Sequence, residues 1–242
     1  MNRNKHPPNS ENHPLIHMNP HDLVPFLEIK LYVDNQTPDI ESFHTAPRLF
    51  ATHMPYHSLP ESIHKTRACK IVYLCRNPKD VLVSIWHFTN RLRSQGMGTN
   101  SLAHVFDQFR NGVSLFGPIW DHVLEYWNQS KEDADKIFFL KFEDLKRDPG
   151  FYLRRLAEFL ECPFSAEEEG IGMVEQISQV CTFESLSGLE INQNGKLSSG
   201  EENKAFFRRG EVGDWKNYLT DEMVHKLDEI IEKKFGGSEL VF

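Results

Sequence analysis

Arg76 has the sequence context of an anion-binding side chain. It directly follows the apolar run Ile71–Cys75, and Asn77–Pro78 opens a helical pattern after it. The apolar run has the composition of a strand covered on both faces. A cation at the carboxyl end of a parallel strand, beside a helix N-terminus, can bind an anion. Ser84 lies about two turns away on the same helix. An ordinary strand–turn–helix with a solvated arginine is equally compatible with this segment.

Two further segments have side chains suited to acid–base or anion chemistry. His53 follows the short apolar stretch 48–52, and a histidine at the carboxyl end of a strand can act as a general base near neutral pH. Taken alone, His53 is better explained as one surface histidine among twelve.

Arg208 and Arg209 precede Gly210, so guanidinium groups and a backbone N–H could approach one phosphate together. A solvated basic turn is the alternative for this pair.

The order of the predicted elements indicates an α/β fold with a parallel β-sheet flanked by helices. Apolar β-branched and aromatic runs predict the strands, while helical periodicity, prolines at N-termini and a Ser165–Glu168 capping box predict the helices. The expected strands are 48–52, 70–75 and 137–142, and the expected helices are 21–28, 78–93, 101–110, 118–129, 148–161, 165–178 and 220–235.

The composition is that of a soluble globular protein. The chain has 242 residues, which suffices for one large domain or two small ones. Its net charge of −8 disfavours bulk binding to nucleic acid or to an anionic membrane, so any anion site must be a local cluster. The four cysteines show no CxxC spacing and are expected to be reduced thiols of a cytoplasmic protein. We see no metal-ligand cluster, no membrane-spanning run and no signal peptide.

Four segments together resemble one known family. They are ATHMPY, YLCRNPKDVLVS, FFLKFEDLKRDP and FFRRGEVGDWKNYLT, and they occur in that family's order. The chain resembles the cytosolic sulfotransferases, the plant branch in particular, over nearly its whole length, so we expect a single domain over 1–242. The resemblance implies a P-loop-like sulfotransferase fold and a cytoplasmic enzyme. It also implies a small-molecule acceptor of phenolic, flavonoid or steroid type, and 3′-phosphoadenosine 5′-phosphosulfate (PAPS) as the sulfuryl donor, without a metal.

The resemblance implies that five residues bind the donor's 3′-phosphate. Arg76 and Ser84 match the first pair of binders in the family. Arg208, Arg209 and Gly210 match the second 3′-phosphate loop. We expect these side chains and the glycine backbone to converge on one point.

The remaining matched residues belong to the reaction centre and to the adenine. His53 matches the catalytic base of the family. Phe142 falls where the family often has a tyrosine against the adenine, so stacking is retained and the hydroxyl group is lost. Thr182 and Phe183, which follow Cys181, match the segment on the adenine side.

The sequence departs from the family at the donor's phosphosulfate. Family members have a strand followed by a PKSGTTW loop that grips this group, and no such segment occurs here. Ala51 also stands where the family has a lysine. We therefore expect a sulfotransferase fold that lacks its first strand and loop, and a poor enzyme, because a set of preorganised donors is absent.

Two alternatives remain. One is a non-catalytic remnant that binds adenosine 3′,5′-bisphosphate, or nothing. The other is a nucleotide or nucleoside kinase, which is disfavoured because GxxxxGK[ST] and a carboxylate motif for magnesium are absent. Lys216 and Thr220 match half of the dimer signature of many animal members, so the oligomeric state is open.

Replacing Arg208 with alanine should weaken nucleotide binding. A bidentate arginine–phosphate contact is worth roughly 1.5–3 kcal/mol. The Kd of Arg208→Ala for adenosine 3′,5′-bisphosphate should therefore rise at least about tenfold, as measured by isothermal titration calorimetry. Lys233→Ala is the control, because Lys233 is expected to be a helix-end charge. Equal affinity in Arg208→Ala and the parent chain would contradict the motif match.

Overall fold

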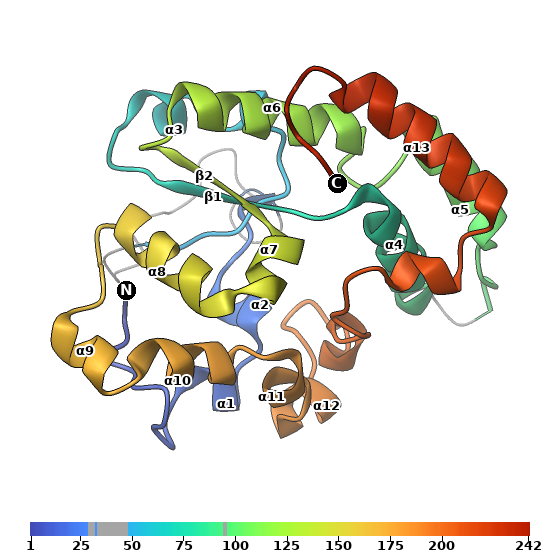
Figure 1. Ribbon diagram of the computed structural model, residues 1–242. Coiled ribbons are helices and arrows are strands. Elements are labelled where there is room, and N and C mark those ends of the chain that lie inside the picture. Colours follow the sequence, from blue (N-terminus) through green and yellow to red (C-terminus); the bar gives the residue numbers. More distant parts are fainter. Residues whose placement is uncertain (29–31, 33–47, 94–95) are drawn as a thin grey trace. The chain divides into compact units, whose positions relative to one another are not determined.

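The chain folds into two compact units, and Figure 1 labels their helices and strands. The structure is a computed structural model that describes residues 1–28, 32, 48–93 and 96–242. Unit 1 consists of Met1–Met54 and Leu153–Gly210, and unit 2 consists of Pro55–Tyr152 and Glu211–Phe242. Each unit therefore combines two stretches that are distant in the sequence.

A parallel two-stranded sheet lies at the centre of unit 2. β1 (Ile71–Cys75) pairs with β2 (Ile137–Lys141), and Ile71 stands opposite Ile137 in the register. Parallel neighbours require a long crossover connection, and in this unit the crossover consists of helices. This arrangement confirms the α/β class that the alternation of strands and helices predicted.

Helices pack on one face of this sheet and form the core of unit 2 with it. Val72 and Leu74 of β1 are 41% and 54% exposed, so the expectation of a strand covered on both faces is wrong. Apolar side chains from the longer helices meet Cys75 of β1 in one buried cluster, in which Leu82 and Val83 are fully buried. The longer helices are α4 (Pro78–Leu92), α5 (Leu102–Arg110), α6 (Ile119–Glu132) and α13 (Asp221–Phe235). The short ones are α3 (Glu61–Lys65), α7 (Phe142–Arg147) and the 3₁₀ turns Tyr56–Ser58 and Asp214–Asn217.

α4 begins where the sequence predicts. The side chain of Asn77 accepts the Lys79 N–H at 3.0 Å, and Pro78 occupies the first turn, where its missing N–H costs nothing. The C-terminal helix α13 is capped in the same way, because the Thr220 hydroxyl accepts the Met223 N–H at 3.3 Å. Both helix starts were readable because capping is a local interaction.

Unit 1 is assembled mainly from short helices that buried amides hold together. Asn19 Nδ2 donates to Asn192 Oδ1 at 2.8 Å, and Asn192 Nδ2 donates to the Leu186 carbonyl at 2.8 Å. Buried polar groups need such partners, so these bonds specify how the short pieces meet. The helices are α1 (Pro14–His17), α2 (Pro20–Leu23), α9 (Ala166–Gly170), α10 (Met173–Val180), α11 (Phe183–Ser187), α12 (Glu190–Asn194) and the 3₁₀ turn Asn203–Phe206.

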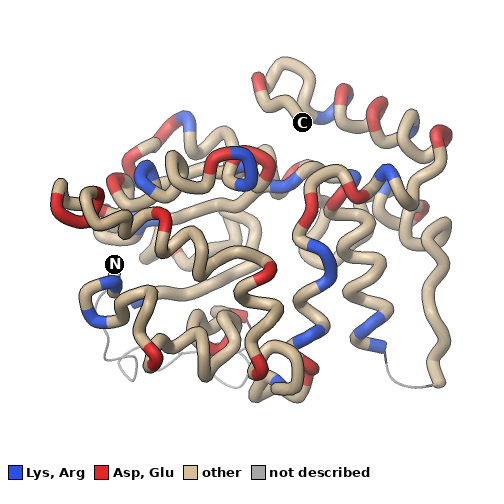
Figure 2. The backbone as a smooth tube through the Cα atoms, turned by 60° about the horizontal axis from the view of Figure 1, so that its bottom comes forward, with Lys and Arg blue, Asp and Glu red and all other residues tan. Residues whose placement is uncertain are grey.

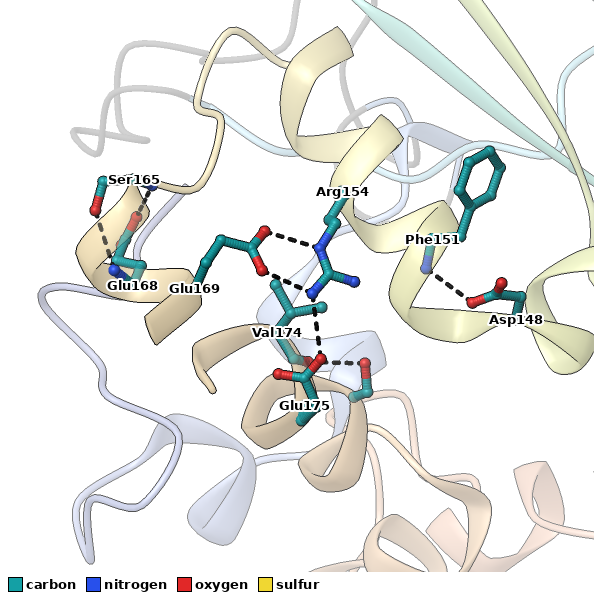
Figure 3. A network of polar contacts seen from close by, with 9 residues as sticks. Asp148, Phe151, Arg154, Ser165, Glu168, Glu169, Val174 and Glu175 are labelled. Atoms are coloured by element: carbon teal, nitrogen blue, oxygen red, sulfur yellow. Dashed lines mark hydrogen bonds and ion pairs between the residues drawn. The ribbon is translucent and has the colours of Figure 1, made fainter. Parts of the chain in front are cut away.

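α8 (Pro149–Phe159) leads the chain into unit 1, and Arg154 on it binds the helices that follow (Figure 3). Its Nε and Nη2 donate to the two carboxylate oxygens of Glu169 at 2.8 and 2.7 Å. Nη2 also contacts Glu175 at 3.2 Å. Ser165 and Glu168 form the predicted capping box at the start of α9.

Three predicted elements of unit 1 are wrong. The helix expected over 21–28 ends at Leu23, and Phe26 makes a bridge with Ala51 instead. The stretch 48–52 is not a strand, and Ala51 makes an isolated parallel bridge with Phe26 instead. The helix expected over 165–178 is two helices, because Gly172 adopts a left-handed φ of 69° between them. The error at 48–52 overrated a short apolar run, and the error at 165–178 overlooked a glycine whose conformation ends helical hydrogen bonding.

Charge is dispersed along the backbone. Figure 2 shows Asp and Glu interspersed with Lys and Arg, so any anion site must depend on local geometry. Within the described part of the chain, no helix combines the length and the apolar character needed to cross a membrane. All four cysteines are free thiols, and burial raises the pKa of Cys75 to about 12, which makes this thiol unreactive.

Leu82→Ala should destabilise unit 2 by about 2–5 kcal/mol, because it leaves a cavity in a fully buried cluster. All four tryptophans lie in unit 2, so tryptophan fluorescence during urea unfolding reports on this unit. Leu92→Ala on the same helix is the matched control, since Leu92 is 42% exposed and should lose little. Equal destabilisation by the two variants would contradict the assignment of this core.

Candidate active site

Arg76 lies at the carboxyl end of β1, where the strand leads into α4. Its Nη2 donates to the Glu211 carbonyl at 2.6 Å, and its guanidinium carbon lies 4.8 Å from the centroid of the Phe142 ring. Its Nε is buried and has no hydrogen-bond partner among the described residues. A buried donor without a partner is costly, and an anion would satisfy it. The guanidinium therefore suits the anion-binding role that the sequence predicts.

Asp80 anchors the neighbouring loop to α4. Its carboxylate is 1% exposed and accepts the N–H of Gly213 at 2.7 Å and of Trp215 at 3.0 Å. Its Oδ2 also lies 3.7 Å from Nη2 of Arg76. The Lys79 ammonium lies 4.6 Å from the Trp215 ring, which strengthens the same junction. The sequence placed Asp80 only in a first helical turn, because its partner Gly213 is 133 residues away.

Ser84 and Phe142 are the other predicted donor-binding residues of unit 2. Ser84 is half-buried on α4, two turns along the helix as the spacing predicts. Phe142 begins α7 directly after β2, so the strand ends one residue earlier than expected. The Phe142 ring lies beside the Arg76 guanidinium, so these two predicted residues are brought together.

Gly210 and Phe183 pack against each other in unit 1. Gly210 has a left-handed φ of 63°, and a Cβ there would lie 2.6 Å from Phe183 Cδ2, so only glycine fits. Thr182 caps α11, and its hydroxyl accepts a backbone N–H at 3.1 Å. Arg208 is half-buried and Arg209 is exposed. The basic loop and the segment that contains Phe183 are therefore neighbours within this unit.

His53 belongs to a row of stacked rings in unit 1. Its imidazole lies parallel to Phe26, with centroids 4.7 Å apart and planes at 4°. Phe26 stacks on His21 at 5.7 Å, and His21 lies 4.2 Å from Phe206. Burial lowers the pKa of His21, and the nearby His53 lowers this pKa further. The His53 side chain is still 43% exposed, which is compatible with the predicted role of a base.

Sequence reasoning proposed His53 as a base, and it did not propose the residues that contact it. His21 contacts Phe26, and Glu28 contacts His53. Both contacts arise from tertiary packing, which leaves no periodic or motif signal in the sequence. Each unit contains part of the predicted set: Arg76, Ser84 and Phe142 in unit 2, and His53, Thr182, Phe183, Arg208, Arg209 and Gly210 in unit 1. Their convergence on one nucleotide stays a prediction. Among the described residues, no group of three or more His, Cys, Asp or Glu could hold a metal ion.

Known proteins share both the sequence and the fold. A profile of the sulfotransferase domain matches residues 1–239. The chain belongs to the sulfotransferase family. Cytosolic sulfotransferase 5 of Arabidopsis thaliana is 50% identical over 242 residues, which are 100% of this chain and 75% of that protein. These two matches confirm the family that the four sequence motifs of this sulfotransferase indicated.

Solved structures agree. The crystal structure of an Arabidopsis thaliana sulphotransferase superposes with a TM-score of 0.74 at 38% identity, covering 100% of this chain and 70% of that one. Retinol dehydratase in complex with androsterone and the inactive cofactor PAP gives a TM-score of 0.66 at 25% identity, covering 84% and 58% of the two chains. The α/β sulfotransferase fold is thus confirmed.

Asp80→Ala should destabilise unit 2 by at least about 2 kcal/mol. The substitution leaves two buried N–H groups without their acceptor, and each such loss costs about 1–3 kcal/mol. Urea unfolding followed by tryptophan fluorescence measures the change. Asp228→Ala is the matched control: Asp228 is 53% exposed and pairs with Lys79, so its loss should cost less than about 1 kcal/mol. Similar losses in both variants would show that Asp80 does not anchor the loop.

Proposed function

We propose that this sulfotransferase moves a sulfuryl group from PAPS to a hydroxyl group of a small-molecule acceptor of phenolic, flavonoid or steroid type. Family membership supports the reaction class. The complex of retinol dehydratase with androsterone and PAP supports both the nucleotide and a flat apolar acceptor. The names of the Arabidopsis relatives support a cytoplasmic location.

The observation that most strongly supports PAPS as the sulfuryl donor is the incomplete hydrogen bonding of the Arg76 guanidinium. Its guanidinium is held by Glu211 and lies beside Asp80, yet its buried Nε has no acceptor among the described residues. A phosphate oxygen is the partner that a guanidinium binds best. Arg76 and Ser84 of unit 2 would bind the donor's 3′-phosphate, and Phe142 would stack on the adenine.

Unit 1 would supply a second set of donor contacts. Arg208 and Arg209 offer charge, and the Gly210 backbone offers an N–H at a position with no Cβ. Thr182 and Phe183 would lie on the adenine side, and Phe183 already packs on Gly210. When bound, PAPS supplies the sulfuryl group, and the chain's own residues hold the nucleotide and handle the acceptor's proton.

His53 would act as the general base for the acceptor. Its imidazole is held by stacking on Phe26 and remains 43% exposed. A neutral imidazole near pH 7 can take the proton of an acceptor hydroxyl, which leaves the oxygen more nucleophilic. The second candidate function is a chain that binds adenosine 3′,5′-bisphosphate without catalysis, which the buried Nε of Arg76 would support without any role for His53.

A transfer assay with a binding assay beside it separates these functions. The 242-residue chain is given ³⁵S-labelled PAPS and a panel of phenols, flavonoids and steroids, and its affinity for adenosine 3′,5′-bisphosphate is measured by calorimetry. We expect slow transfer, and we expect His53→Ala to reduce turnover roughly a hundredfold or more with little change in nucleotide affinity. Exposed His104 provides the control variant, His104→Ala, which should keep full turnover.

Three other results of these assays would contradict the proposed function or the proposed role of His53. Nucleotide binding without transfer to any acceptor would establish the non-catalytic alternative. Neither binding nor transfer would remove both functions. Equal loss of turnover and of nucleotide affinity in His53→Ala would give His53 a structural role.

A further inference from the structure

A parallel pairing of two short segments places Glu28 beside His53. Phe26 and Ala51 form an isolated parallel bridge, and the Leu27 N–H donates to the Ala51 carbonyl at 2.9 Å. Glu28 and His53 each follow this bridge by two residues. In a parallel pair, residues advance along both segments together, so the register brings the carboxylate to the histidine.

One carboxylate oxygen of Glu28 contacts His53 at two points. Oε1 accepts the backbone N–H of His53 and lies 3.5 Å from its Nδ1. Nδ1 is buried, whereas the His53 side chain as a whole is 43% exposed. The imidazole therefore turns Nδ1 inward toward the carboxylate, and its accessible edge is the one with Nε2.

The surroundings hold this ring orientation. Phe26 covers one face of the imidazole at 4.7 Å, with the two planes at 4°. Among the described residues, Glu28 lies beside His53, His21 acts electrostatically with it, and Asp22 acts on His21 in turn. The charges of His53 and His21 disfavour each other, whereas the Glu28 carboxylate favours a proton on His53.

We propose that Glu28 is a positioning residue that holds the Nδ1–H tautomer of His53 and so presents a bare Nε2 to the acceptor. The proposal rests on the proposed role of His53 as general base. The hydrogen bond made by one ring nitrogen determines which tautomer is present, and a carboxylate beside Nδ1 selects a proton there. The acceptor's O–H bond breaks, its electron pair stays on the oxygen, and a new N–H bond forms at Nε2. The Glu28 carboxylate then stabilises the resulting imidazolium.

Nitrogen NMR of the histidine rings tests this without any sulfuryl transfer. The full chain is labelled with ¹⁵N-histidine, and a His53→Gln variant assigns the His53 signals among the twelve histidines. We expect the neutral form of His53 to be mainly the Nδ1–H tautomer. Glu28→Ala should shift it toward the Nε2–H tautomer. Glu28→Gln retains an acceptor oxygen without the charge, so it should keep the tautomer and lower the pKa of His53.

The control variant is Glu158→Ala, since Glu158 is exposed on α8, and it should leave the His53 signals unchanged. A parent chain with the proton of neutral His53 on Nε2 would overturn the proposal. So would an unchanged tautomer in a folded Glu28→Ala variant, folding being judged from the amide spectrum. If Glu28→Ala does not fold, Glu28→Gln decides, and an unchanged pKa of His53 overturns the proposal.

Turnover measurements distinguish a failure of the proposed role of Glu28 from a failure of the proposed role of His53. In the transfer assay, Glu28→Ala should lower kcat at least about tenfold with little change in the acceptor's KM, and Glu28→Gln should recover part of the loss. Absent transfer, or an active His53→Ala variant, would remove His53 as the base while leaving the tautomer result intact. A normal kcat in folded Glu28→Ala with an inactive His53→Ala would remove only Glu28.

Discussion

The buried carboxylate of Asp80 is the interaction on which the arrangement of unit 2 depends. A charge that is 1% exposed is costly unless it is bonded, and here two backbone N–H groups and a nearby guanidinium compensate it. These bonds join the first turn of α4, the loop that includes Trp215, and Arg76 at the end of β1. Arg76 and its neighbouring loop are therefore positioned by one shared acceptor.

Unit 1 positions His53 by other interactions. Its helices are short, so buried amides and stacked rings provide the order that longer helices and strands give to unit 2. His53 is held by one parallel bridge, one stacked phenylalanine and the Glu28 carboxylate. In both units an acidic side chain lies between a backbone N–H group and a nitrogen-bearing side chain, which ties the functional group to the main chain.

Family membership and geometry support the proposed reaction from independent directions. The sulfotransferase profile and the relatives identify the reaction class, and the chain spans 75% of the length of one such relative. The geometry adds a reason for particular residues. Gly210 leaves no room for a side chain against Phe183, and Arg76 keeps a buried donor available for an anion. A motif match alone names such residues without explaining why their types are required.

The sequence by itself determined the features that depend on near neighbours. Periodicity and caps predicted β1, α4 with Asn77, the Ser165–Glu168 box and the position of Arg76, because these interactions span a few residues. The four motifs were also enough to identify the family. The same reasoning overrated 48–52, because a strand needs a partner that composition does not reveal.

Only the tertiary structure decided what Asp80 and Glu28 do. Asp80 accepts N–H groups 133 and 135 residues away, and Glu28 contacts a histidine 25 residues away. Neither pairing has a fixed spacing or a local conformational signature. Whether a carboxylate caps a helix, anchors a loop or orients a base depends on which backbone donors the completed fold brings to it.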